Sequence, residues 1–171
     1  DLRILARCRY DPRWRRVLAL GVERLQPEQA ARILHQVLND VEPLGQRLHR
    51  GLRIALLILA SDVPVYDSKL TDEIFGKLRD LIAQAEPGVL HEFQEPLIRF
   101  QASRFGDRVR ELILEGSLRS NAGEGSRICS CALREWAEED PEVLLSWMER
   151  ASGAALEVQS RILRIGEGIL Q

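Results

Sequence analysis

The chain has 171 residues, of which 45% are hydrophobic, 29% are charged and only 5% are aromatic. This much apolar material in one domain-sized chain excludes a disordered tail. The formal net charge of −2 and the isoelectric point near 6.0 exclude a general electrostatic attraction to nucleic acid or to anionic membranes.

Helical spacing of apolar residues begins near the N-terminus. It predicts helices over residues 2–9, 12–25, 27–39 and 43–61. Three of them begin at a proline that follows an acidic or amide residue, a pairing typical of the first helical turn. The apolar stripe of the second helix comprises Trp14, Val17, Leu18, Val22 and Leu25, and that of the third comprises Ala30, Ile33, Leu34, Val37 and Leu38.

The same pattern continues to the C-terminus and predicts helices over 69–85, 88–104, 107–118, 124–139, 141–151 and 154–170. Pro96 lies inside the second of these and could split it. The loop between Ser61 and Ser68 is expected to be the least firmly structured segment in the first half of the chain. The longest apolar run, Ile54 to Ala60, is far shorter than the roughly 18 residues that span a bilayer, so we interpret it as a buried helix segment.

Helices with short connections and broad apolar stripes bury those stripes by stacking as antiparallel pairs. The sequence therefore predicts an all-α fold, an irregular HEAT-like stack of helical hairpins that forms an α-solenoid over residues 1–171. A single globular helical bundle is the alternative. The chain begins and ends inside amphipathic patterns, which indicates a single helical-repeat domain that is a fragment of a larger protein.

One segment has a family resemblance. Residues 10–20 read Tyr-Asp-Pro-Arg-Trp-Arg-Arg-Val-Leu-Ala-Leu, an aromatic residue and a proline turn before a tryptophan-arginine helix. This segment resembles the helical region that follows the ATPase core in NACHT-type members of the STAND signalling NTPases, and Ile33–Leu38 fits the same style. The resemblance implies a helical array that senses a ligand or holds a nucleotide switch closed. The ATPase motifs would lie outside this chain.

Reactive residue types lack the spacing that chemistry requires. Cys129 and Cys131 are two apart on a predicted helix and point to different faces, and His35, His49 and His91 are scattered. We therefore expect no catalytic residue, no cofactor and no metal ligand. The odd count of three cysteines is typical of a reducing compartment, and we expect a cytoplasmic protein with no membrane partner.

Arginine supplies nearly all the positive charge and gathers in two groups. The candidate interaction surface comprises Arg47, Arg50, Arg53, Arg99, Arg104, Arg108 and Arg110. Such faces of helical repeats commonly bind proteins, so the first hypothesis is a non-enzymatic interaction, sensor or regulatory module. Its partner would be another protein or the rest of its own polypeptide.

Two alternatives stay open. A nucleic-acid-binding HEAT-like repeat would place the same arginines on phosphates, and its affinity would fall steeply with salt. A small helical enzyme would bring carboxylates such as Glu92 and Glu95 together in a cleft.

Overall fold

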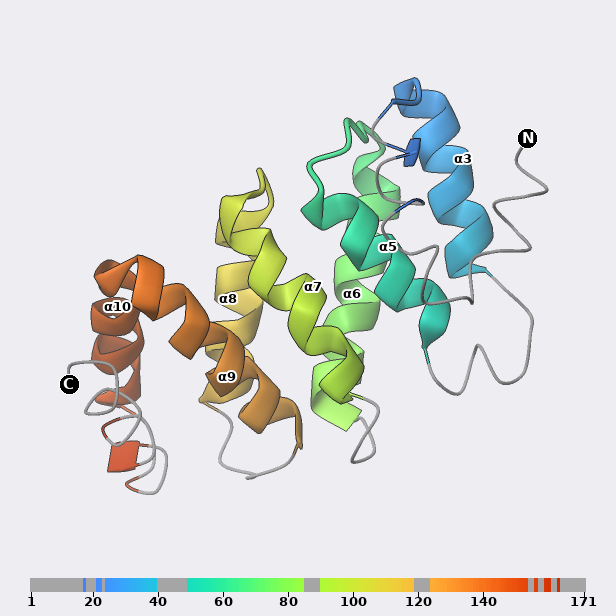
Figure 1. Ribbon diagram of the computed structural model, residues 1–171. Coiled ribbons are helices and arrows are strands. Elements are labelled where there is room, and N and C mark those ends of the chain that lie inside the picture. Colours follow the sequence, from blue (N-terminus) through green and yellow to red (C-terminus); the bar gives the residue numbers. More distant parts are fainter. Residues whose placement is uncertain are drawn as a thin grey trace.

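The computed structural model describes residues 17, 21–22, 24–39, 49–84, 90–118, 124–153, 156, 159–160 and 163 (Figure 1). These residues contain helices and no strand, which confirms the predicted all-α class. The predicted helix over 2–9 and most of those over 12–25 and 154–170 lie outside the described residues. The α-helices are α3 (Pro27–Leu38), α5 (Arg50–Ala60), α6 (Ser68–Gln84), α7 (Gln94–Arg99), α8 (Gly106–Ser117), α9 (Glu124–Glu139) and α10 (Pro141–Ala151); the 3₁₀ segments are η2 (Leu90–Phe93) and η3 (Phe100–Ala102).

Two of the helix starts that were predicted at prolines are confirmed. Pro27 and Pro141 are the first residues of α3 and α10. The Asp140 carboxylate accepts a hydrogen bond from the Glu142 N–H at 3.1 Å and so caps α10. These caps satisfy N–H groups that have no partner within the helix.

Two predicted helices differ from the structure in their bounds. Of the helix predicted over 43–61, residues 43–48 lie outside the described residues, and α5 begins at Arg50 because His49 before it has a left-handed φ of 48°. The helix predicted over 88–104 is replaced by η2, α7 and η3. Pro96 lacks the N–H that a continuous helix would need, so the α-helix starts at Gln94 and keeps Pro96 within its first turn.

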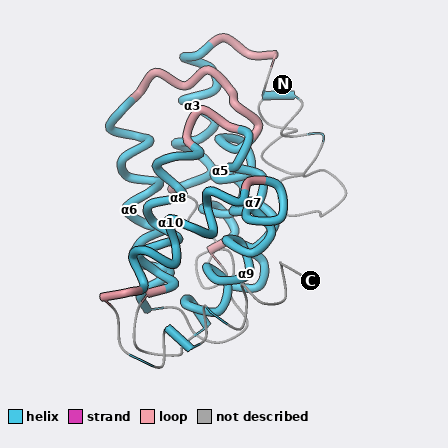
Figure 2. The backbone as a smooth tube through the Cα atoms, turned by 90° about the vertical axis from the view of Figure 1, so that its left-hand side faces the viewer, coloured by secondary structure: helices cyan, strands magenta, loops and turns pink. Residues whose placement is uncertain are grey.

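The helices form two layers. α5 contacts α3 and α7, and α7 in turn contacts α9, so these four helices follow one another in one layer (Figure 1). α6 packs beside α8 and also contacts α5 and α9, and α10 packs on α9. Seen from the side, α6, α8 and α10 lie on one side of the molecule and α5, α7 and α9 on the other (Figure 2).

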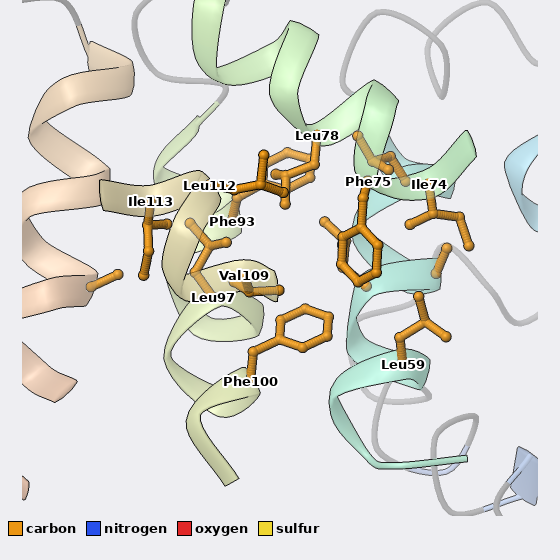
Figure 3. Close-up of a cluster of buried hydrophobic side chains, with 14 of the residues drawn as sticks. Leu59, Ile74, Phe75, Leu78, Phe93, Leu97, Phe100, Val109, Leu112 and Ile113 are labelled. Atoms are coloured by element: carbon orange, nitrogen blue, oxygen red, sulfur yellow. The ribbon is translucent and has the colours of Figure 1, made fainter. Parts of the chain in front are cut away.

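The core lies between these layers (Figure 3). Phe75 of α6 is at its centre, with ring centroids 5.9 Å from Phe100 and 5.6 Å from Phe105 in tilted arrangements. Helical spacing of apolar residues also predicts a buried stripe on each of the helices over 69–85 and 124–139. Both stripes are confirmed on α6 and α9, since all of these residues are buried: Ile74, Phe75, Leu78, Leu81, Ile82, Cys129, Ala132, Leu133 and Trp136.

Trp14, Trp136 and Trp147 each lie among apolar neighbours on predicted helices, which predicts that all three anchor the core. Trp136 and Trp147 are fully buried, which confirms this for both, and Trp14 lies outside the described residues. Val17 departs from its predicted stripe, because it is exposed while Val22 is fully buried. Positions five apart on a helix differ by roughly 140° around its axis, so the two valines cannot share the centre of one face.

Glycine allows two close helix contacts. Gly51 and Gly125 are the second residues of α5 and α9. A Cβ atom on Gly51 would overlap the carbonyl of Val37 near the end of α3, and one on Gly125 would overlap the carbonyl of Ile82 near the end of α6. At both positions a helix start therefore touches a helix end directly through the backbone.

The loop between α5 and α6 is more firmly held than the sequence led us to expect. Val63 and Val65 of this loop are only 1% and 4% exposed, and their side chains belong to the core. The loop is thus fixed by burial at alternate residues. No helix in the described part of the chain is both long enough and apolar enough to cross a bilayer.

Candidate functional site: a hollow between α5 and α7

A surface hollow of about 460 Å³ lies where α5 meets η2 and α7. It brings together residues that are far apart in the sequence, including the predicted interaction residues Arg53 and Arg99. Its lining consists of Arg53, His91, Glu92, Gln94, Glu95, Ile98 and Arg99.

Ion pairs join the charged side chains of this hollow into a chain. Arg53 Nη1 pairs with Glu92 Oε2, and Arg53 Nη2 lies 3.8 Å from Glu95 Oε2. Arg99 Nη2 donates to Glu95 Oε1 at 2.8 Å across one helical turn. Glu95 therefore accepts a hydrogen bond from Arg99 and forms a longer ion pair with Arg53, and through the two it couples α5 to α7.

The two arginines differ in how deeply their side chains are buried. The Arg53 side chain is only 11% exposed, whereas Arg99 and both glutamates are each exposed by a third or more. Arg53 thus forms the buried base of the hollow, and its accessible rim consists of Glu92, Glu95 and Arg99. Ile98, half-buried, adds an apolar wall.

The formal charges of the hollow cancel, because the two arginines are matched by the two glutamates. A site of this kind exerts little long-range attraction on a strongly charged ligand. At short range it offers a ligand hydrogen-bond donors, from the arginines, and hydrogen-bond acceptors, from the glutamates. That combination suits a polar protein surface better than a phosphate backbone.

The other predicted arginines do not join this hollow. Arg104 contacts the loop after α5, at the opposite end of that helix from Arg53. Arg108 pairs with Asp72 of α6 at 2.7 Å and lies over the Phe75 ring at 4.5 Å. Arg110 lies 3.9 Å from Asp140, and Arg50 is the half-buried first residue of α5. Arg47 lies outside the described residues.

Carboxylates of the chain itself therefore pair with Arg53, Arg99, Arg104, Arg108 and Arg110. This arrangement favours contacts between helices over contacts with nucleic-acid phosphates. Further pairs link α6, α8 and α10: Arg79 with Glu115 at 3.8 Å, and Arg150 with Glu111 at 2.7 Å. Glu111, which is exposed, raises the pKa of Arg150 above its usual value, because it accepts hydrogen bonds from the guanidinium and carries a negative charge.

The residues with reactive side chains lie apart. Cys129 is buried, and Cys131, which is half-buried, follows two positions later on α9. Within the described ranges, no group of three or more His, Cys, Asp and Glu side chains has the arrangement to hold a metal ion. Glu92 and Glu95 do line one hollow, as the enzyme alternative requires, and both pair with Arg53.

Sequence reasoning missed the pairing of Arg53 with Glu92 and the role of Arg104. The pair of Glu95 with Arg99 carries a local signal, since the two residues are four apart on a helix. The other contacts join residues about forty positions apart, and no local pattern marks them.

The class that the fold defines is an all-helical protein with two layers of helices. Comparison of the chain with protein families, with curated proteins and with solved structures finds no match. Nothing in these comparisons links the chain to NACHT-type NTPases.

Proposed function

We propose that this chain is a HEAT-like helical-repeat module that acts by binding and catalyses no reaction. The observation that carries the proposal is the order of helix contacts. Along one layer, α3, α5, α7 and α9 each pack on the next, and α6 packs on α8 in the other. Helices of a repeat array contact chiefly their neighbours in this way, because each pair covers the apolar face of the one before it.

The hollow between α5 and α7 is the proposed contact surface. It has an apolar wall, a rim of exposed Glu92, Glu95 and Arg99, and a fixed Arg53 beneath them. An arginine that is already held in place loses little side-chain entropy when a partner binds. The expected partner is a protein segment, either from another chain or from the same polypeptide.

The larger context that we propose is a NACHT-type signalling or defence ATPase in the cytoplasm. It is supported by the resemblance of residues 10–20, which lie almost wholly outside the described residues, and of Ile33–Leu38. On α3, Ile33, Leu34 and Val37 of this second segment are buried, as helices of such arrays require. In this role, partner binding would bias the equilibrium of a switch located elsewhere in the polypeptide.

The test begins with the reading frame that surrounds the chain. A Gly-x-x-x-x-Gly-Lys-Ser/Thr motif upstream of Asp1 is the expected finding. The nucleotide-dependent oligomeric state of that longer protein is then measured by mass photometry, with and without Arg99→Glu. We expect Arg99→Glu to shift the equilibrium at least about fivefold, the lower range of measured allosteric couplings.

Arg79→Glu is the matched control. Arg79 is also exposed and pairs with a carboxylate, that of Glu115, but it lies in the other layer of helices. Equal effects of the two substitutions would contradict the assignment of the hollow. A start codon at residue 1 with a stop after residue 171 would contradict the ATPase context. A defined catalytic activity that is lost in Glu92→Gln would contradict the non-enzymatic function.

A further inference from the structure

Arg104 joins two parts of the fold with one side chain. It lies between η3 and α8 and reaches back to the loop between α5 and α6. Its Nη2 donates to the carbonyl oxygens of Val63 at 2.7 Å and Val65 at 3.0 Å. Asp62 Oδ1 lies 3.7 Å from Arg104 Nε and also accepts a hydrogen bond from the Arg104 backbone N–H at 3.1 Å.

The loop has few other means of satisfying its backbone. Asp62 takes a left-handed φ of 58°, and the alternate residues Val63 and Val65 turn into the core. Their carbonyls cannot join a helix there, and a buried carbonyl without a partner destabilises the fold. Arg104 donates to both carbonyls at once, because its planar guanidinium carries several donors in a fixed fork, and for the Val63 carbonyl it adds to the bond from the Val65 N–H.

Two aromatic rings hold the guanidinium in this position. Its central carbon lies 4.7 Å from the centroid of Phe105 and 6.0 Å from that of Tyr66. Phe105 is half-buried and packs on Phe75 of α6, so the ring beneath Arg104 is itself held against the core. The side chain is therefore fixed from several sides before it meets the loop.

We propose that Arg104 is a latch that ties the α5–α6 connection to the start of α8. Through this latch the helical pair α5–α6 and the next pair, α7–α8, move as one body. The inference rests on the proposed function as a helical-repeat array. Release of this latch, with the core still folded, is the local opening by which the array flexes at this joint.

Amide hydrogen exchange measured residue by residue on the full chain tests the latch. The reporters are the N–H groups of Asp62 and Val65, which donate to the carbonyls of Leu59 and Val63. In Arg104→Ala we expect their protection to fall about 10–100-fold, the range for losing one or two hydrogen bonds to a charged group. The amide of Leu133, in the middle of α9, should keep its protection.

Two further variants sharpen the test. Arg104→Lys keeps the charge but lacks the planar fork, so it should also lower protection at Val65, and it serves if Arg104→Ala does not fold. Arg108→Ala is the matched control, because Arg108 likewise pairs with an aspartate, Asp72, and lies over an aromatic ring, Phe75, but does not contact the loop between α5 and α6. It should leave both reporters unchanged.

Unchanged protection at both reporters in Arg104→Ala and Arg104→Lys would overturn the latch. A uniform loss that includes Leu133 would overturn it as well, since Arg104 would then stabilise only the whole fold. Small-angle X-ray scattering of the unsubstituted chain tests the array separately. A profile of a compact bundle would refute the array, whatever the exchange experiment shows.

Discussion

The two buried tryptophans differ in the hydrogen bonding of the indole N–H, and this difference predicts unequal losses of stability on the same substitution. Trp136 Nε1 donates to the Ile98 carbonyl at 3.0 Å and so ties α9 to α7. Trp147 Nε1 is equally buried but has no hydrogen-bond partner in the part of the chain that the structure describes. We compare Trp136→Phe with Trp147→Phe.

The magnitudes follow from burial and hydrogen bonding. Replacing either buried indole by a phenyl ring costs about 2 kcal/mol through lost apolar burial and a small cavity. For Trp136 the lost hydrogen bond adds about 1 kcal/mol, for a total near 3 kcal/mol. For Trp147 the substitution removes a buried donor without a partner, which offsets about 1–3 kcal/mol of this cost and leaves a net change between a loss of about 1 kcal/mol and a gain of about 1 kcal/mol.

Urea unfolding followed by circular dichroism at 222 nm measures both free energies, and it avoids the change in tryptophan fluorescence. We expect Trp136→Phe to be less stable than Trp147→Phe by about 2 kcal/mol or more. For a chain of this size that corresponds to about 4–8 °C in Tm. Equal losses, or a larger loss for Trp147→Phe, would refute the reasoning from the indole N–H.

Two further predictions concern backbone contact and protonation. Gly125→Ala should destabilise the fold by about 1–3 kcal/mol, because its Cβ overlaps the Ile82 carbonyl, whereas Gly76→Ala, with open space on α6, should stabilise it by about 0.5–1 kcal/mol; thermal melts of both variants test this. Burial, and to a smaller extent the charge of Lys77, lower the pKa of His49 from its usual 6.5, so the unfolded chain binds this proton more readily than the folded one. Stability should therefore fall as the pH drops below 6.5, and His49→Asn, which tolerates the left-handed φ, should reduce that slope in urea titrations at several pH values. An unchanged slope would contradict it.

Local patterns predicted most helices well. The ranges 124–139 and 141–151 agree with the structure at both ends, and α3, α6 and α8 differ by one residue. These helices carry apolar stripes, and three of their starts are marked by a proline or a capping residue: Pro27 on α3, Asp67 before α6, and Asp140 with Pro141 on α10. Both signals act over a few residues, so a single sequence contains them.

The contacts of the candidate site could not be predicted in this way. The partner of Arg53 comes from η2 about forty residues later, and Arg104 returns to a loop at a similar separation. Their positions depend on how α5 and α7 pack, which the periodicity of each helix does not specify. The break of the predicted 88–104 helix at Pro96 has a local cause, but the docking of α7 and η3 on α9 depends on long-range contacts. The Trp136 indole bonds to Ile98, and the Gln101 amide donates to the Trp136 carbonyl at 3.3 Å.

The glycines at the starts of α5 and α9 bear on how distant relatives of this chain can be recognised. Apolar stripes occur in most helical proteins, so they distinguish one family from another poorly. A residue without a side chain, one position into a helix and seated on the end of an earlier helix, is a much rarer requirement. A search pattern that demands glycine at the positions of Gly51 and Gly125, 74 residues apart in this chain, would therefore select for this packing rather than for helicity alone.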